Sequence, residues 1–526
     1  MKLTDFENPD MAPLFEAAGI SLPKYDRSAL KIRTKEAPFW VHFGAGNIFR
    51  AYQARLLEQL LNEGLWDRGV IVAEAYDGEL IDRAYAPYDN LSLSVVLRGN
   101  GQVEKSLLGC ITESLRADMA FPGDWNRLRE IFTAPSLQVV TFSVTENGYG
   151  APESDIARGL SARFTMGRLT ALLHERFLSG ALPLTLQSQD NCSRNGDLIR
   201  KAVLAYAKGW EALGITGAAF TEYVSDPEKI SCPLSMIDKI TPRPDPKVKE
   251  LLDADGFEDC DIFETEKHSF SAPFVNAEET GYLVVEDSYV NGRPPFEKAG
   301  VIFTDRETVE KVERMKVGTC LNPLHTALAT FGCMMGFTRV SEEMKDPDIL
   351  RFLERLGHEE GLPVCESPGI LDPRAFMDEC LYVRFPNPHI PDTPQRIAVD
   401  NSATIPIRFG GTLREYIRRG ENPEKLTFIP LMYAAYARYL RGIDDFGNEF
   451  TPSPDARLPE LMPIAAFLDV REGEQNFDCL RELFTKADIF GADLTECGLY
   501  DKVLSMTKEL FAGPGAVRKT LQKYVK

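Results

Sequence analysis

A lysine, an asparagine and a histidine stand close together between Lys316 and His325, and side chains of these types can oxidise an alcohol. Removing hydride from an alcohol carbon requires the hydroxyl proton to leave as well, and a lysine accepts that proton when burial and nearby charges lower its pKa. The amide of Asn322 can stabilise the developing alkoxide, and a neutral His325 can hydrogen-bond the reacting oxygen. The same pattern also fits a solvated lysine, a structural histidine and an ordinary helix boundary.

Helix signals around this segment predict how the three side chains are positioned. Residues 304–307 (Thr-Asp-Arg-Glu) form a capping box, so a helix is expected to start there. Because the residue before a proline avoids helical geometry, that helix should break near Asn322. Pro323 suits the first position of a second helix, with Asn322 as its N-cap. The positive end of that helix favours a neutral His325, and Lys316, Asn322 and His325 are expected to meet at the junction.

A second pattern lies near the N-terminus, where a buried strand at 39–43 is followed by a glycine-rich turn over 44–50 (Gly-Ala-Gly-Asn-Ile-Phe-Arg). Glycines let the backbone approach a pyrophosphate, and the helix that follows directs its N-terminal N–H groups at the phosphates. Phe49 stands where the usual fingerprint has its third glycine, so the motif alone is weak, and a plain turn is the alternative.

An acidic residue follows the next predicted strand, which covers 69–75. Glu74, or Asp77 three residues later, can accept hydrogen bonds from an adenosine ribose and repel a 2′-phosphate. This pattern predicts NAD as the cofactor, whereas a surface carboxylate in an unrelated α/β protein is the alternative.

The strand, helix and strand over 39–75 predict a βαβ unit and a parallel sheet. From residue 304 onward the patterns are mostly helical, and the Pro-rich piece 291–295 resembles a linker. We therefore expect an α/β fold: a Rossmann-type dinucleotide-binding domain over 1–298, followed by a mainly α-helical catalytic domain over 299–526. Further strands are predicted at Leu137–Val144, Leu182–Leu186, Ala218–Tyr223 and Tyr282–Val285.

Composition narrows the possible partners. Of the 526 residues, 59 are Lys or Arg and 79 are Asp or Glu, which gives a net charge of −20 and argues against nucleic acid as a partner. No apolar stretch is long enough for a membrane span, and the polar N-terminus lacks a signal-peptide core, so a cytoplasmic protein is expected. The ten cysteines have no zinc-site spacing, so no metal is expected.

Six motifs in a fixed order give a more specific indication. Over roughly residues 37 to 445 the chain resembles the polyol-specific long-chain dehydrogenase/reductase family, which includes mannitol 2-dehydrogenases and fructuronate reductases (mannonate oxidoreductases). The resemblance rests on the glycine-rich turn, the lysine segment and four further segments, namely 145–149, 190–196, 235–242 and 387–393.

The resemblance implies a zinc-free mechanism with the active site between the two domains. Lys316 would be the general base in oxidation and the general acid in reduction, with Glu313 exchanging protons with it from the same helical face. Asn191 and Asn322 would form the oxyanion hole, and His325 would bind the reacting oxygen. Asp238 and Arg396 would bind substrate. The cofactor would contact residues of the first domain, namely Gly44, Gly46, Asn47, Ile48, Arg50, Glu74, Asp77 and Thr145.

The chain departs from the family pattern at two places. Five residues separate Lys316 from Asn322, where the family commonly has four, so the turn must absorb one residue near Gly318. Asn147 stands where the family commonly has lysine. Both departures leave the proposed catalytic groups in place and affect only which substrate the family resemblance implies.

The leading functional prediction is NAD-dependent interconversion of a keto sugar acid and its aldonate, of the fructuronate/mannonate type. A carboxylate bound in a closed site needs a cation, and Arg384, Arg396, Arg408 and Lys239 are available. One alternative is a mannitol-type polyol 2-dehydrogenase. Another, of a different class, is a non-catalytic nucleotide-binding regulator, which the co-occurrence of the four proposed catalytic groups disfavours.

Overall fold

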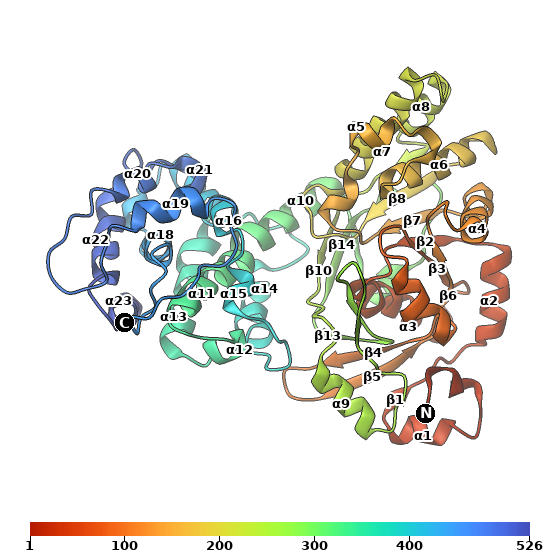
Figure 1. Ribbon diagram of the computed structural model, residues 1–526, viewed down its shortest axis with the longest axis horizontal. Coiled ribbons are helices and arrows are strands. Elements are labelled where there is room, and N and C mark those ends of the chain that lie inside the picture. Colours follow the sequence, from red (N-terminus) through yellow and green to blue (C-terminus); the bar gives the residue numbers. More distant parts are fainter. The chain divides into compact units, whose positions relative to one another are not determined.

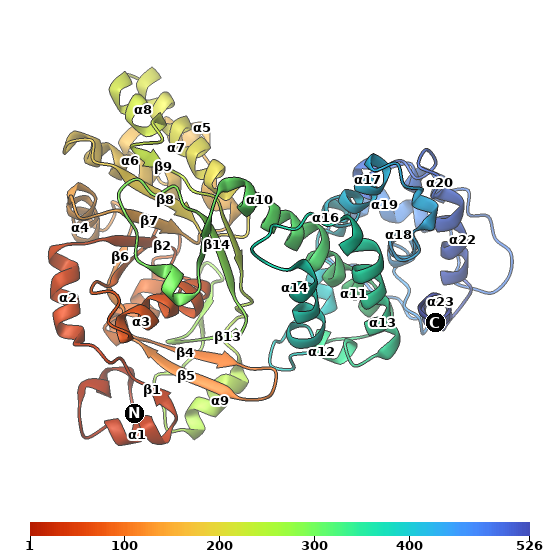
Figure 2. The same cartoon turned by 180° about the vertical axis from the view of Figure 1, so that it is seen from behind.

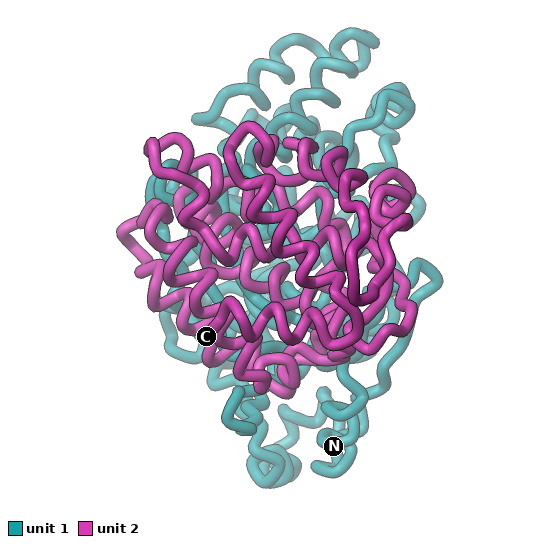
Figure 3. The backbone as a smooth tube through the Cα atoms, turned by 90° about the vertical axis from the view of Figure 1, so that its left-hand side faces the viewer, with its two compact units in different colours: residues 1–310 teal, residues 311–526 magenta.

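The computed structural model describes residues 1–526, which fold as two compact units, Met1–Glu310 and Lys311–Lys526 (Figure 3). Each unit is described by itself. None of the helices has both the length and the apolar character needed to cross a membrane.

The main sheet of unit 1 has six parallel strands in the order β6-β3-β2-β7-β8-β9 (Figure 1). Counted along the chain, the order is 3-2-1-4-5-6, which is the Rossmann arrangement with its switch point between the first and fourth strands. The predicted Rossmann-type fold is therefore confirmed. The strands are β2 (Trp40–Phe43), β3 (Val70–Glu74), β6 (Ile111–Arg116), β7 (Val139–Phe142), β8 (Leu184–Ser188) and β9 (Ile230–Ser231).

Helices cover both faces of this sheet, because alternate residues of each buried strand face opposite sides. Val41 and Phe43 of β2 belong to a core shared with α4, α6 and α7, whereas Trp40 belongs to a core shared with α3. The helices of unit 1 are α1 (Ala12–Ala17), α2 (Arg27–Glu36), α3 (Ala54–Asn62), α4 (Pro122–Thr133), α5 (Glu153–Ile156), α6 (Thr165–Leu178), α7 (Asn195–Ala212), α8 (Ala218–Ser225) and α9 (Pro246–Ala254).

Unit 1 also contains smaller sheets, in which the strand predicted at Tyr282–Val285 is confirmed as β14 and the other strands are not predicted by the sequence patterns. In a four-stranded sheet of order β1-β5-β4-β13, strands β4 and β5 run side by side (Figure 2). A three-stranded sheet has the order β10-β14-β15, and β11 and β12 form a pair. The bounds are β1 (Ile20–Ser21), β4 (Ser92–Leu97), β5 (Val103–Leu108), β10 (Ser235–Asp238), β11 (Phe263–Glu264), β12 (Phe270–Ser271), β13 (Phe274–Glu278), β14 (Tyr282–Glu286) and β15 (Ile302–Thr304).

Unit 2 is helical, as expected. Its central helix, α18 (Phe428–Tyr439), is buried at all twelve positions and packs against α22. The unit begins within α10 (Arg306–Met315). Its other helices are α11 (Asn322–Met334), α12 (Val340–Glu343), α13 (Pro347–Arg355), α14 (Pro373–Glu379), α15 (Pro394–Ile397), α16 (Asn401–Arg408), α17 (Gly410–Arg418), α19 (Leu458–Ala465), α20 (Leu480–Phe484), α21 (Ala487–Phe490), α22 (Tyr500–Leu510) and α23 (Ala516–Val525).

Two local predictions are wrong. The segment predicted as a strand at Ala218–Tyr223 is the helix α8, which buries Phe220, Tyr223 and Val224 at helical spacing. The Pro-rich segment is not a linker: Asn291 donates to the Pro183 carbonyl, and Phe296, the residue directly after the segment, packs edge-on against Trp40 at 5.4 Å. These contacts belong to unit 1, which continues to Glu310, so a domain boundary after residue 298 stays a prediction.

Candidate active site

The glycine-rich turn follows β2 at the switch point of the Rossmann sheet. Gly44 has a φ of +119°, and a Cβ there would lie 2.3 Å from the Ser143 carbonyl oxygen, so only glycine fits. A Cβ on Gly46 would meet nothing within 4 Å, which leaves open space beside the backbone. The helix that follows starts at Asn47. An open turn that leads into a helix N-terminus at this crevice suits a pyrophosphate.

Phe49, in the place of the third glycine, opens a π-helical turn over Phe49–Gln53. Its ring stacks on the His42 imidazole of β2, with 4.0 Å between centroids and 14° between planes. Burial lowers the pKa of His42 to about 3, so the imidazole is neutral and hydrogen-bonds Thr141 and Ser143. An aromatic contact therefore joins helix and strand where a third glycine would allow closer packing.

The carboxylates of Glu74 and Asp77 are buried and accept hydrogen bonds from groups within unit 1. Glu74 accepts hydrogen bonds from the backbone N–H groups of Ala45, Tyr76 and Asp77, and burial is the largest cause of its raised pKa. Asp77 accepts one from the Thr265 hydroxyl at 2.7 Å. Glu74 thus ties the glycine-rich turn to the end of β3, a function that sequence spacing does not reveal.

Asn47 and Arg50 also direct their side chains into the protein. The Arg50 guanidinium is fully buried and donates to the Ala272 carbonyl and to the Ser92 and Ser271 hydroxyls. Asn47 accepts from Arg50 and donates to the Phe270 carbonyl. Their side chains are therefore engaged within the protein, and only their backbone groups remain for the predicted contact with a cofactor. Ile48 lies between them in the sequence.

Three further predicted residues follow strands of unit 1. Thr145 lies three residues after β7, Asn191 three residues after β8, and Asp238 ends β10. The amide of Asn195 donates to the carbonyls of Asp190 and Ser235, which ties the loop after β8 to β10. Thr145 and Asn191 are exposed, whereas Asp238 is buried.

In unit 2 a π-helical turn joins α10 to α11. It runs over Lys316–Cys320, and the Leu321 N–H donates to the Lys316 carbonyl five residues back. A π-helical turn holds one residue more than an α-helical one, so the extra residue predicted near Gly318 is accommodated here. Lys316 is the first residue of the turn and is only 3% exposed.

The predicted helix break is confirmed, with differences in the capping. Asp305, not Thr304, caps α10 by accepting from the Thr308 N–H. Asn322 is the first residue of α11 rather than its N-cap; Leu321 precedes it, and no side chain caps this end. The Asn322 amide is therefore not used by its own helix terminus.

His325, in the first turn of α11, has a defined environment. Its side chain is 15% exposed, its ring stacks on Phe385 at 5.0 Å, and its Nε2 lies 3.6 Å from Asp392 Oδ2. Burial, rather than the helix terminus, is the largest cause that lowers its pKa to about 4. The imidazole is neutral at pH 7, as predicted, and can hydrogen-bond a substrate oxygen.

Three arginines surround His325 closely enough to lower its pKa further, and Asp392 opposes them. Arg396 forms a two-pronged ion pair with Asp392, with N–O distances of 2.6 and 2.5 Å, and its side chain is 66% exposed. Arg384 is buried, and Arg408 donates to the Thr326 hydroxyl. Sequence reasoning missed Asp392, although its spacing of four residues from Arg396 is a signal for a helical ion pair.

Two further residues of the predicted site, Glu313 and Lys239, lie on other elements. Glu313 is partly exposed in the last turn of α10, three residues before Lys316. Lys239, expected to add a cation for the substrate, instead donates to the backbone carbonyls of residues 278–280. Its ammonium group serves the loop between β13 and β14.

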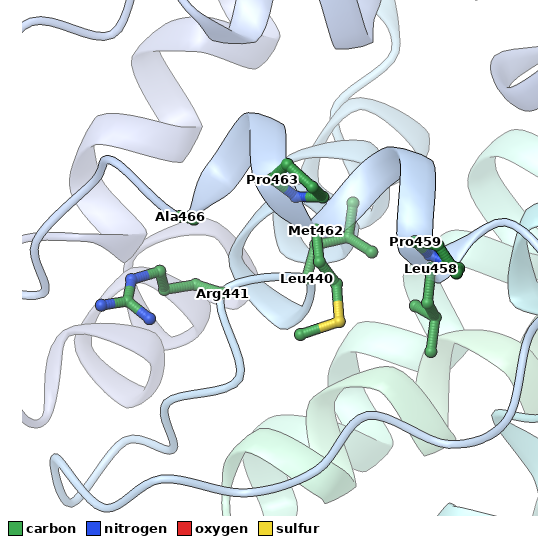
Figure 4. Close-up of a pocket in the computed structure, with 7 residues that line it drawn as sticks. All are labelled: Leu440, Arg441, Leu458, Pro459, Met462, Pro463 and Ala466. Carbon is green, nitrogen blue, oxygen red and sulfur yellow. The ribbon is translucent and has the colours of Figure 1, made fainter.

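A separate apolar groove of about 540 Å³ lies beside α19 in unit 2 (Figure 4). Its only charged residue is Arg441, whose Nε donates to the Leu468 carbonyl. None of the predicted site residues lines it, and its side chains carry no group for acid–base chemistry. The lining residues are Leu440, Arg441, Leu458, Pro459, Met462, Pro463 and Ala466.

Comparisons with known proteins agree with this arrangement. The sequence matches the mannitol dehydrogenase Rossmann domain over residues 39–298 and the mannitol dehydrogenase C-terminal domain over residues 308–510. A D-mannonate oxidoreductase of Thermotoga maritima is 44% identical over 97% of each chain. A mannitol 2-dehydrogenase of Pyrenophora tritici-repentis is 30% identical, over 96% of this chain and 84% of that one.

A solved structure has a similar fold over the full length. Pseudomonas fluorescens mannitol 2-dehydrogenase, in a ternary complex with NAD and D-mannitol, is 26% identical, covers 99% of each chain and has a TM-score of 0.72. The family domains and the full-length relatives lead to one conclusion: the chain belongs to the mannitol dehydrogenase family.

Proposed function

We propose that the protein is an NAD-dependent oxidoreductase that interconverts fructuronate and mannonate. The similarity to a D-mannonate oxidoreductase over 97% of both chains supports this substrate class. The single observation that carries it is Arg408, a largely buried guanidinium beside His325 that pairs with no acidic side chain.

The residues of unit 2 supply the proton chemistry. NAD, when bound, accepts or returns the hydride. Lys316, which is buried, accepts the hydroxyl proton during oxidation and returns it during reduction. The amide of Asn322 stabilises negative charge on the reacting oxygen, a role also proposed for Asn191 of unit 1, and neutral His325 orients that oxygen. Glu313 exchanges the proton between Lys316 and water.

The residues of unit 1 supply the cofactor site. The turn from Gly44 to Ile48 would hold the pyrophosphate, and Thr145, which follows β7, would contact the cofactor. The acidic side chains of Glu74 and Asp77 at the end of β3, although both brace the turn, are the residues on which the preference for NAD over NADP rests. We therefore expect a higher specificity constant for NADH than for NADPH, and a clear preference for NADPH would contradict the assignment.

The proposal that the substrate carries a carboxylate depends on which of Arg384, Arg396 and Arg408 lacks an acidic partner. Arg396 already has a carboxylate partner in Asp392. Burial lowers the pKa of Arg408 to about 10, and its side-chain hydrogen-bond partner is the neutral Thr326 hydroxyl. A substrate carboxylate would supply the missing negative charge, and the planar guanidinium matches its two oxygens.

The test is the ratio of specificity constants for fructuronate and fructose, measured on the wild type and on Arg408→Met. A hydrogen-bonded carboxylate–guanidinium pair contributes about 1.5 to 3 kcal/mol, so the variant should lose about 10- to 100-fold on fructuronate and little on fructose. Arg396→Met is measured beside it, because Arg396 is the other guanidinium predicted to bind substrate and already pairs with Asp392. Fructose as the better substrate, or equal losses on both, would favour a mannitol-type polyol 2-dehydrogenase.

We propose that the protein acts on these small molecules in the cytoplasm, without a nucleic-acid or membrane partner. The net charge of −20 supports the first exclusion. Turnover of NADH with any of the sugars separates an enzyme from a nucleotide-binding regulator.

A further inference from the structure

The Asp190 carboxylate of unit 1 binds the loop that follows β7. Its Oδ2 accepts from the Val144 N–H at 2.8 Å and from the Tyr149 hydroxyl at 2.6 Å, and its Oδ1 accepts from the Thr145 N–H at 3.2 Å. Tyr149 is buried and also bonds the Ser188 hydroxyl. One side chain thus holds the whole turn from Val144 to Tyr149.

This turn has a strained backbone at its exposed residue. Thr145 has a φ of +62° and a ψ of 167°, a region that residues other than glycine rarely adopt. Such a conformation persists only where its surroundings impose it. The two N–H groups held by Asp190 are those of Thr145 and of the residue before it.

The backbone of Asp190 is fixed as well. Its N–H donates to the Ser188 hydroxyl, and its carbonyl accepts from the Asn195 amide, which also bonds Ser235 at the start of β10. The next residue along the chain is Asn191. Asp190 therefore couples the turn that presents Thr145 to the loop that presents Asn191.

We propose that Asp190 is a positioning residue that sets Thr145 for the cofactor and Asn191 for the reacting oxygen. The roles of those two residues rest on the proposed function. Asp190 does not touch substrate in this assignment; it acts through the two loops. Removing its charge frees the Thr145 backbone to relax toward an ordinary conformation and loosens the loop that carries Asn191.

The chain offers a matched control in Asp155. Its carboxylate accepts from two consecutive backbone N–H groups, those of Arg163 at 2.8 Å and Phe164 at 3.1 Å, and from the Tyr206 hydroxyl at 2.7 Å. The partner types are the same as those of Asp190, but Asp155 supports no predicted site residue. Asp190→Asn and Asp155→Asn therefore remove the same kind of interaction from the same unit.

Four quantities are compared in full-length wild type and both variants: the thermal midpoint, hydrogen exchange of the Val144 and Thr145 amides, the NADH dissociation constant from fluorescence, and kcat and KM. We expect similar losses of stability in the two variants. Asp190→Asn alone should speed exchange at the two amides, raise the NADH dissociation constant at least about tenfold and lower kcat at least about tenfold. Asp155→Asn should change binding and kcat less than about twofold.

The proposal is overturned if Asp190→Asn binds NADH and turns over like Asp155→Asn. If Asp190→Asn does not fold, Tyr149→Phe and its counterpart Tyr206→Phe carry the same comparison with one hydrogen bond removed from each cluster. NADH affinity and amide exchange need no sugar substrate. If the wild type acts on neither fructuronate nor fructose, the proposed function fails while these two readouts still decide the role of Asp190.

Discussion

At the scale of single residues, Lys316 is the group on which the proposed chemistry depends most. Lys316→Ala should lower turnover at least about a hundredfold, because general acid–base catalysis contributes about 10²- to 10⁴-fold. The NADH dissociation constant should stay within about twofold, because the predicted cofactor residues lie in unit 1. Steady-state kinetics and NADH fluorescence measure the two quantities.

Chemical rescue supplies the control for this variant. A small primary amine added to Lys316→Ala should restore part of the turnover, because it replaces the missing base in the space left by a buried side chain. It should not affect the wild type. Near-normal turnover of the variant without any amine would remove Lys316 from the mechanism.

His325 makes a second prediction, which concerns pH. Its pKa is about 4 in the folded protein and 6.5 when unperturbed, so the unfolded chain binds the proton more readily between these values. The stability contributed by neutral His325 is fully present above pH 6.5 and is lost as the pH falls toward 4, by on the order of 3 kcal/mol. Thermal midpoints of the wild type and His325→Gln should therefore converge or cross as the pH is lowered. A constant difference from pH 8 to 4 would show that His325 titrates normally.

The sequence identifies candidate catalytic residues more readily than it identifies the hydrogen-bond partners of buried carboxylates. Lys316, Asn322 and His325 are recognisable because their chemistry and spacing are local. The bracing role of Glu74 depends on the N–H of Ala45, which is 29 positions away in sequence, and the role of Asp190 depends on a turn more than 40 residues earlier. Such pairings are created by the sheet and leave no periodic pattern.

At the scale of elements, the π-helical turn at Lys316–Cys320 sets the register between Lys316 and α11. Deleting Gly318 should convert this turn to an α-helical one and rotate Lys316 by about 100° relative to Asn322 and His325, since each residue adds that angle in an α-helix. We expect at least about a hundredfold loss of turnover with NADH binding intact. Kinetics and fluorescence test this together.

Gly318→Ala is the matched control for the deletion. A Cβ at this position meets nothing within 4 Å, and the residue has no left-handed backbone conformation. Alanine should keep the activity and stabilise the protein by up to about 1 kcal/mol, because it restricts the unfolded chain more than glycine does. Full activity of the deletion variant would show that the register of the turn is unimportant.

Helices and strands could be predicted where the sequence has a clear hydrophobic period and turn residues at its ends. The other elements could not. The βαβ unit from β2 to β3 follows from buried apolar runs on either side of a glycine-rich turn. The strand β6 lies at the edge of the sheet, and its Glu113, Ser114 and Arg116 hide the buried pattern. At α8, aromatic and β-branched residues favoured a strand, but their burial at helical spacing decided the outcome.

At the scale of the whole molecule, the predicted site residues are divided between two units of different architecture. Unit 1 carries the Rossmann sheet and the residues predicted to bind the cofactor, and unit 2 carries Lys316, Asn322, His325 and the arginines. The division follows from the sequence, because the helical patterns begin near residue 304. The first unit ends at Glu310, beyond the Pro-rich segment whose packing composition did not indicate.

The last prediction concerns the whole enzyme and its independence of metal. A metal in an alcohol dehydrogenase polarises the reacting oxygen, and in the proposed mechanism asparagine amides, His325 and Lys316 would supply the donors and the base for that oxygen. Dialysis against EDTA should leave kcat and KM unchanged, and elemental analysis of the active protein should find less than a stoichiometric amount of metal. Loss of activity on chelation, restored by added Zn²⁺ and accompanied by one bound metal per chain, would replace the lysine-based mechanism with a metal-assisted one.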